Sequence, residues 1–293
     1  MSPLRLLLAG WVLVCASAAS AQGLQVHFFD VGQGDAVLIQ SPSGHNVLYD
    51  GGEVGDVTLA QLSAAGITSL DLVIASHNHA DHIGGLASVI RHYRPRFYLD
   101  NNVPATTRAY QHVLEAVRAA GSELLEASGQ RIALGPVTLR ILSPPQRAAW
   151  EQNDNSVGVV VEYGAFRLSL GGDAESRLWQ WWTKEFPDAV SEVHVHKASH
   201  HGSANGDTAA ALARLSPEVV VVSAGFQNQY GHPHAEALHL YAEHGALVYQ
   251  SALHGTVVVE AQDSGQYAVF LAGGEGARPP TPGLRALKTP ALD

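Results

Sequence analysis

The stretch that decides the fold is LVIASHNHADHIGG, residues 72–85. Its apolar start, Leu72–Ala75, predicts a short buried strand, and it ends in two glycines. Four side chains of metal-ligating type follow the strand within six residues: His77, His79, Asp81 and His82. Imidazole and carboxylate groups are good ligands for zinc and related divalent ions. A solvated polar loop is the simpler alternative, but the buried strand and the glycine pair that bound the segment argue against it.

Further residues of the same chemical types follow later strands. Asp173 comes directly after the apolar segment Phe166–Leu170, where it also suits the N-cap of a helix. His200-His201 and His232 follow the next two expected strands, Val190–Lys197 and Val219–Ser223. Each histidine alone could be an ordinary surface residue. Because the carboxyl ends of strands in α/β sheets gather functional groups, their recurrence at these positions predicts one shared site.

The order of expected elements defines the fold class. Strands and helices alternate in two halves, with helices expected at Ile83–Tyr93 and Thr106–Ala120 in the first and Ala174–Phe186 in the second. This pattern predicts an α/β protein, a four-layer αββα sandwich with two facing sheets and helices outside. No linker divides residues 22–272, so we expect one domain there. The Gly/Pro-rich segment 273–293 is expected to be disordered.

These residues resemble the motifs of the metallo-β-lactamase superfamily. His77-x-His79-x-Asp81-His82 is similar to its signature, Asp50-Gly51-Gly52 to its first motif and Gly172-Asp173 to its bridging aspartate. More narrowly, the chain resembles the hydrolase domain of ComEC competence proteins. The segments that carry this resemblance are 30–36 (DVGQGDA), 153–156 (NDNS), 200–203 (HHGS) and 228–233 (NQYGHP).

The resemblance implies the αββα fold, two divalent metal ions and hydrolysis by a metal-held hydroxide. The ions would be zinc, with manganese as the alternative. Members of this group act on nucleic acids or other phosphodiesters, including a phosphorylcholine ester of teichoic acid. The implied substrate of this chain is therefore a phosphate ester, a nucleic acid or another small hydrolysable molecule.

The resemblance also implies a set of metal ligands. His77 and His79 would hold the first ion, and Asp173 would bridge to the second. Strand order in the superfamily favours His232 as the partner of Asp81 and His82 at the second ion. The usual third histidine of the first ion has no clear counterpart, because His92 and His112 lie in expected helices.

Other roles follow from this assignment. Either one residue of the His200-His201 pair completes the first ion, or that ion binds weakly. Of the pair, we favour His201 as the ligand and His200 as the acid that protonates the leaving group, so that His200 and Asp81 are the expected catalytic side chains. Asp35 and Asp50 would orient ligands, although both could equally be turn residues in Gly-rich loops. Asn155 and Ser156 would contact the substrate.

The N-terminus predicts export. An apolar run over residues 6–16 is followed by Ala19-Ser20-Ala21, which fits a signal peptide of residues 1–21 and a mature chain beginning at Gln22. An uncleaved membrane anchor is the alternative. The single cysteine, Cys15, lies inside this segment, so the mature chain would have no disulfide. We therefore expect a secreted or periplasmic protein.

Three classes of function remain open from the sequence. A phosphodiesterase or nuclease is favoured by the ComEC resemblance. Hydrolysis of amide or ester bonds, as in a β-lactam or a lactone, would use the same metal ligands. A non-catalytic metal-binding protein is disfavoured by the intact ligand set. The formal net charge of −10 weakens the case for a nuclease relative to an enzyme for small phosphodiesters.

Overall fold

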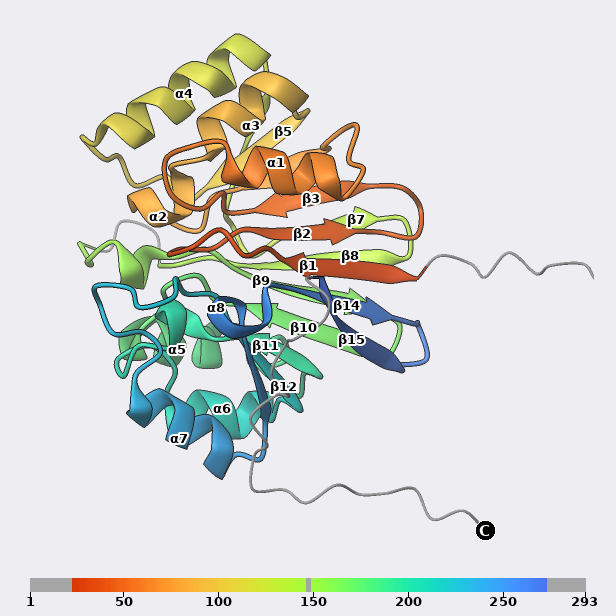
Figure 1. Ribbon diagram of the computed structural model, residues 1–293, viewed down its shortest axis with the longest axis vertical. Helices are drawn as coiled ribbons and strands as arrows, with labels where there is room; N and C mark the ends of the chain where they lie inside the picture. The colour runs from red at the N-terminus through yellow and green to blue at the C-terminus, as the bar shows by residue number, and fades with distance from the viewer. Residues whose placement is uncertain (1–22, 146–148, 273–293) are drawn as a thin grey trace, which may run out of the picture.

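The computed structural model describes residues 23–145 and 149–272. Two β-sheets face each other, and each is covered on its outer face by helices, so the four-layer αββα sandwich expected from the sequence is confirmed (Figure 1). The expected signal peptide and the expected disordered tail lie outside the described residues.

One sheet has eight strands in the order β15-β14-β1-β2-β3-β4-β5-β6, and the other has seven in the order β13-β12-β11-β10-β9-β8-β7. The strands run parallel from β3 to β6 and from β10 to β13, and antiparallel elsewhere. In the first sheet the strands are β1 Leu24–Phe28, β2 Val37–Gln40, β3 Asn46–Tyr49, β4 Leu72–Ile74, β5 Phe97–Asp100, β6 Glu123–Glu126, β14 Thr256–Ala261 and β15 Tyr267–Ala272. In the second they are β7 Arg131–Leu134, β8 Val137–Leu142, β9 Gly158–Tyr163, β10 Phe166–Leu170, β11 Val195–Lys197, β12 Val219–Val222 and β13 Leu247–Gln250.

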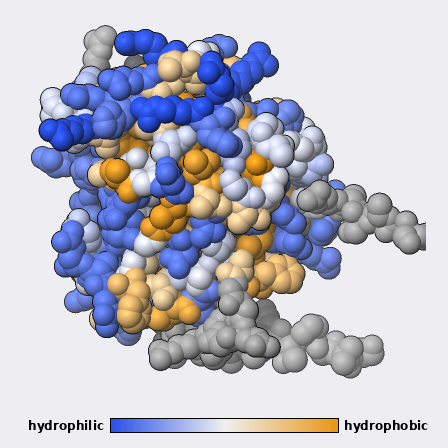
Figure 2. Space-filling model, turned by 45° about the horizontal axis from the view of Figure 1, so that its top comes forward, coloured by the Kyte–Doolittle hydropathy of each residue, from blue (hydrophilic) through white to orange (hydrophobic). Residues whose placement is uncertain are grey.

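The helices form the two outer layers. Apolar residues of α1, α3 and α4 pack on the first sheet, and those of α5, α6 and α7 pack on the second. The helices are α1 Val57–Ala64, α2 Ala80–Ile83, α3 Leu86–Tyr93, α4 Arg108–Ala120, α5 Ser176–Glu185, α6 Ala209–Leu215, α7 Ala235–Glu243 and α8 Ser251–His254, with short 3₁₀ turns at Asn153–Asn155 and Ser199–Gly202. The face shown in Figure 2 is mainly hydrophilic with scattered apolar residues, as expected for an outer layer in contact with water.

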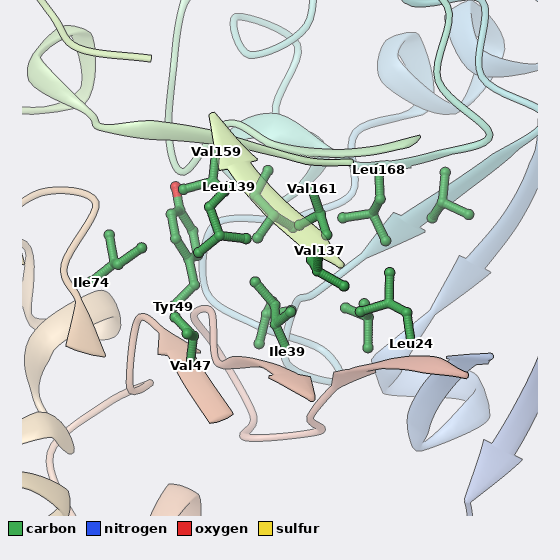
Figure 3. Packing of buried hydrophobic residues seen from close by; sticks show 14 of the residues in the cluster. Leu24, Ile39, Val47, Tyr49, Ile74, Val137, Leu139, Val159, Val161 and Leu168 are labelled. Atoms are coloured by element: carbon green, nitrogen blue, oxygen red, sulfur yellow. The ribbon is translucent and has the colours of Figure 1, made fainter. Parts of the chain in front are cut away.

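The central core lies between the two sheets. Inward side chains of both sheets meet there, among them Ile39 and Val47 from one sheet and Leu139 and Val161 from the other (Figure 3). Tyr49 crosses this core, and its hydroxyl donates a hydrogen bond to the carbonyl of Val157 at 2.8 Å. The contact satisfies the one polar group of a buried ring and ties the two sheets together next to the loops that follow β3 and precede β9.

The structure differs from the sequence expectation in several elements. The helix expected at Ile83–Tyr93 is divided at Gly84-Gly85 into α2 and α3. The strand expected at Val190–Lys197 is shorter than expected and is limited to β11. Val190 and Val193 lie outside the sheet, because they pack with the helices. The strands β6 and β7 were not expected, since their sequences mix charged and apolar residues at exposed sheet edges.

In the described part of the chain, none of the helices combines the length and the apolar character that crossing a bilayer requires.

Candidate metal centre

The loop after β4 brings the first ligand-type residues together. It leads into α2, and His82 is buried at the end of this short helix. The glycine pair that follows lets α2 lie against the loop after β3. A Cβ atom on Gly84 would lie 2.3 Å from the backbone nitrogen of Val54, and one on Gly85 would lie 2.3 Å from the carbonyl oxygen of Gly51. Only glycine permits this close approach, so the pair contributes to placing His82.

His77, His79 and Asp173 form one group of converging ligand atoms. Nε2 of His77 lies 3.0 Å from Nδ1 of His79 and 3.7 Å from Oδ2 of Asp173. Nδ1 of His77 faces the hydroxyls of Ser76 and Ser156 at 3.0 and 3.4 Å. Because these hydroxyls can bond to Nδ1, Nε2 is left free for a ligand.

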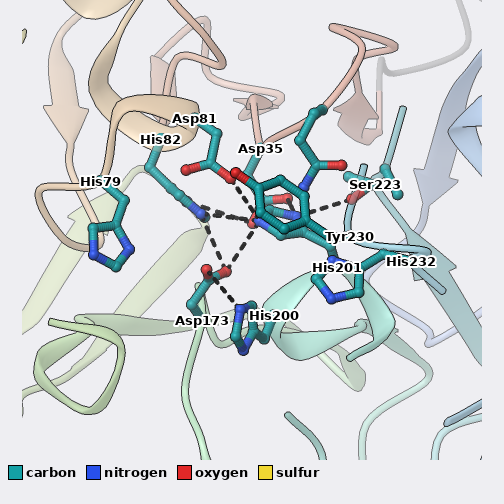
Figure 4. Close-up of polar contacts among 12 residues, drawn as sticks. Asp35, His79, Asp81, His82, Asp173, His200, His201, Ser223, Tyr230 and His232 are labelled. Carbon is teal, nitrogen blue, oxygen red and sulfur yellow. Dashed lines mark hydrogen bonds and ion pairs between the residues drawn. The ribbon is translucent and has the colours of Figure 1, made fainter. Parts of the chain in front are cut away.

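A second group forms on the other side of Asp173. Its members lie at the ends of four different segments: Asp35, His82, Asp173 and His201. Nε2 of His82 and Nε2 of His201 lie 3.1 and 3.4 Å from Oδ1 of Asp173. Oδ2 of Asp81 lies 3.2 Å from Nε2 of His201 and so adjoins this group (Figure 4). The two oxygens of Asp173 thus face different groups.

The chemistry of these groups fits divalent metal ions. Nitrogen and carboxylate oxygen atoms converge on two points, and Oδ1 of Asp173 is buried without a hydrogen-bond partner among the described residues. Burial alone lowers the pKa of His82, but the carboxylates of Asp173 and Asp50 raise it well above its usual value. A site that favours a buried imidazolium in this way also favours a bound cation.

Asp50 orients His82. Its Oδ2 lies 2.9 Å from Nδ1 of His82 and accepts a hydrogen bond from the Ser76 hydroxyl at 2.7 Å, while its Oδ1 accepts one from the Ser76 backbone N–H at 2.7 Å. Burial raises the pKa of Asp50 in spite of these contacts. The carboxylate holds the ring so that Nε2 of His82 points into the centre.

Asp35 has a partner that the sequence analysis missed. It forms a fully buried ion pair with Lys197, the last residue of β11, and its Oδ1 lies 3.3 Å from Nδ1 of His201. Burial by itself raises the pKa of Asp35, but Lys197 and His201 more than reverse this and leave it lowered. The signal in the sequence was a lysine at the end of an apolar strand, three residues before His200.

The histidines of the later loops are arranged differently from our expectation. His201 lies beside Asp81 and His82, where we expected His232. His232 belongs to neither group, and its ring centroid lies 6.0 Å from that of His201 and 5.5 Å from that of His200. The physical reason is the path of the chain: a tight turn directly after β11 directs His201 inward, whereas a longer loop separates β12 from His232.

His200 and His232 border the open side of the centre. Nε2 of His200 lies 3.8 Å from Oδ2 of Asp173, and its Nδ1 lies 3.4 Å from Glu175. The ring of His232 stacks on that of Tyr230 at a centroid distance of 5.6 Å. Burial, followed by the nearby His201 and His200, lowers the pKa of His232 to about 4. This ring is therefore neutral at physiological pH.

The expected substrate-contacting residues Asn155 and Ser156 lie in different surroundings. Ser156 accepts a hydrogen bond from the backbone N–H of Asp173 at 3.2 Å, so it contacts the ligands. Asn155 is 2% exposed and donates to the carbonyl oxygens of Trp150 and Glu151, which turns it away from solvent. Its neighbour Asn153 lines the cavity instead. His92 and His112 are exposed on α3 and α4.

A cavity of about 360 Å³ opens over the two groups. Gln33, His79, Asp81, Asn153, His200 and Tyr230 are among its lining residues. A larger cavity of about 620 Å³ lies around Arg167, His194 and Arg214 and contains neither group. Both arginines there donate to backbone carbonyls, as in Arg167 to Ala189 and Arg214 to Val190. The smaller cavity is therefore the candidate active site.

Comparisons with known proteins agree with this geometry. Residues 29–225 match the metallo-beta-lactamase superfamily. ComE operon protein 3 of Bacillus subtilis is 28% identical over 258 residues, covering 81% of this chain and 33% of that protein. Competence protein ComA of Neisseria gonorrhoeae is 28% identical over 256 residues, covering 86% and 34%. The chain thus spans about a third of the length of these relatives, and the expected resemblance to ComEC proteins is confirmed.

Solved structures show the same fold. Tm1679, described as a metal-dependent hydrolase of the beta-lactamase superfamily, aligns with a TM-score of 0.52 and 18% identity, covering 82% of this chain and 99% of that one. The match over residues 29–225 covers more than half of the chain and includes both ligand groups that share Asp173. The chain belongs to the metallo-beta-lactamase superfamily.

Proposed function

We propose that the chain is an exported phosphodiesterase or nuclease that uses two divalent ions. The observation that carries this proposal is the position of Asp173. Its Oδ2 faces His77 and its Oδ1 faces His82 and His201, so one carboxylate adjoins both groups of ligand atoms. A shared carboxylate of this kind supports a pair of neighbouring ions better than a single one.

The assignment of ligands follows from the contacts. We assign His77 and His79 to the first ion and Asp173 to both. The second ion takes Asp81, His82 and His201, which revises our expectation for His201 and His232. Imidazole-rich ligand sets favour zinc, with manganese as the alternative. Bound there, the ions would polarise the scissile group and lower the pKa of a water to about 7.

The balance of charge supports two ions. Four carboxylates surround the centre, Asp35, Asp50, Asp81 and Asp173, and three of them are fully or almost fully buried. Lys197 is the lysine that contacts this set. Because buried charges are stable only when they are compensated, the remaining negative charge favours divalent cations.

The chain's own residues orient the groups that act on the substrate. Nδ1 of His82 is held by Asp50, and Nδ1 of His201 lies 3.0 Å from the carbonyl oxygen of Ser223, so both Nε2 atoms face the centre. His200 borders the cavity, and we propose that its Nε2 delivers a proton to the leaving oxygen.

The substrate class is inferred from the cavity and from the relatives. Among the described residues that line the cavity there is no lysine or arginine, so an anionic substrate would be held mainly by the ions. ComA is named a competence protein, which supports a polynucleotide. The net charge of −10 supports a small phosphodiester or a single strand over a long duplex.

A substrate panel tests this function. Zinc-loaded protein is assayed with bis-nitrophenyl phosphate, single-stranded DNA and nitrocefin, before and after chelation. We expect the first two to be cleaved, nitrocefin to be left intact, and chelation to abolish turnover. Asp173→Ala should lose both ions and activity, whereas His239→Ala, at an exposed residue of α7, should resemble the wild type. Cleavage of nitrocefin alone would contradict the phosphodiesterase proposal and support hydrolysis of amide bonds instead.

A further inference from the structure

The turn that carries His200 and His201 has an uncommon backbone. These two residues have φ angles of 48° and 54°, in the left-handed region, and Gly202 continues with a φ of 76°. Residues with a side chain occupy this region only at an energetic cost, so such a turn persists where surrounding contacts hold it. Those contacts therefore help to decide where the two imidazole rings point.

A buried carboxylate anchors the start of this turn. Oδ2 of Asp207 accepts a hydrogen bond from the backbone N–H of Ser199 at 3.1 Å and another from the hydroxyl of Tyr241 at 2.8 Å. Oδ1 of Asp207 lies 3.0 Å from Nε2 of His196. All four residues are buried, Asp207 with an exposed fraction of 6%. The carboxylate is thus fully engaged, and one of its partners is the backbone next to His200.

The network continues away from the metal centre. Nδ1 of His196 lies 2.8 Å from the hydroxyl of Ser169, and its ring packs edge-on against Trp179 of α5. Serine, histidine and aspartate follow one another as in a hydrolase triad, but Ser169 is 2% exposed and cannot meet a substrate. Burial raises the pKa of Asp207, yet His196 and the other donors leave it lowered, which favours a charged carboxylate. The arrangement therefore serves to hold structure.

The chain between the turn and Asp207 is also in tight contact with it. A Cβ atom on Gly206 would lie 2.5 Å from the carbonyl oxygen of Ser199 and 3.3 Å from Cβ of His200. The backbone N–H of Gly206 donates to the carbonyl of Ser203 at 3.1 Å. A displacement of Asp207 would therefore press on Ser199 and His200 at the start of the turn.

We propose that Asp207, supported by His196 and Tyr241, is a positioning residue that fixes the His200–His201 turn and thereby places His201 at the second ion. The inference rests on the proposed metal site, since it concerns one of its ligands. Asp207 itself touches neither ligand group: it lies beside β11 with His196, while Lys197 of the same strand faces the centre.

Stepwise zinc titration of the full chain tests this role, at a temperature well below unfolding. We expect Asp207→Ala to weaken binding of the second ion by about tenfold or more, as the loss of supporting contacts does in other metal sites, and to leave the first ion nearly unchanged. Asp207→Asn should recover part of the loss, because its amide oxygen can still accept from Ser199. Tyr241→Phe, which removes one partner and keeps the ring, should weaken the second ion by a smaller factor.

Thr208→Ala is the matched control. Thr208 is the next residue, and its hydroxyl caps α6 by accepting from the backbone N–H of Ala211 at 3.1 Å, so its loss destabilises the protein without touching the turn. We expect both ions to bind to Thr208→Ala as in the wild type. The same result for folded Asp207→Ala would overturn the proposal.

If Asp207→Ala fails to fold, Tyr241→Phe decides: weaker binding of the second ion supports the proposal, and wild-type affinity overturns it. If the wild-type protein binds two zinc ions but cleaves no substrate of the panel, the proposed function is contradicted. The zinc titration still tests the role of Asp207 in that case.

Discussion

His82 and His201 meet with their Nε2 atoms 3.2 Å apart, although 119 positions separate them in the sequence. One follows β4 of the first sheet and the other follows β11 of the second, so the contact joins the two halves of the sandwich. The centre exists only where both sheets present the carboxyl ends of their parallel strands. Which side chains reach the centre therefore depends on the direction in which each loop leaves its strand.

Removal of His201 or of His232 should have different consequences. His201→Ala removes a nitrogen from the Asp81–His82 group and should leave about one zinc ion per chain. His232→Ala should retain both ions and change turnover, because His232 borders the cavity and belongs to neither ligand group. Metal analysis and kinetics on both variants check this. A second ion that is lost from His232→Ala and kept in His201→Ala would restore our expectation from the sequence.

Lys197 should be essential for stability through its contact with Asp35. Lys197→Met leaves a buried carboxylate without its cation, which costs roughly 3–5 kcal/mol in the free energy of unfolding. The double variant with Asp35→Asn should recover much of this loss, because no charge then remains unpaired. Urea denaturation of the metal-free proteins measures both. Lys184→Met, at an exposed lysine paired with Glu185, is the control and should change little. Equal stability of Lys197→Met and the wild type would contradict this account of the pair.

Asp207 should make stability depend on pH in the acid range. Its pKa is lowered in the folded protein, so its contribution is present above the unfolded value of about 4 and is lost as pH falls through the folded value. The groups that face it are His196 and Tyr241. At pH 7, Asp207→Asn should lower the free energy of unfolding by about 1–3 kcal/mol, since it weakens buried hydrogen bonds. The difference from the wild type should shrink below about pH 4. A difference that stays constant down to pH 2 would argue against a charged Asp207.

Export should be visible at the N-terminus of the purified protein. We expect protein recovered from the periplasm or the medium to begin at Gln22, after the Ala19-Ser20-Ala21 sequence. N-terminal sequencing or intact mass measurement tests this. Recovery of a chain that still carries Met1 from the soluble cytoplasmic fraction would contradict it.

The sequence by itself determined the local part of this site. The segment 72–85 places four ligand-type side chains within six residues after a buried strand. Their positions along the loop are fixed by the order of residues alone. The alternation of strands and helices determined the αββα class, and the position of Asp173 directly after β10 made it a candidate for the bridge. Features of this kind depend on short-range geometry, which residue type and spacing largely fix.

Tertiary structure alone decided which distant side chains join that segment. The order of strands favoured His232 as the ligand of the second ion. The left-handed turn at His200 and His201 directs His201 inward instead. Two histidines in sequence do not predict a left-handed turn. The pairing of Lys197 with Asp35 and the anchoring of Ser199 by Asp207 likewise depend on which strands and helices become neighbours. The physical reason is that contacts across the two sheets are set by packing and by the path of each loop, which long-range burial determines and local sequence does not.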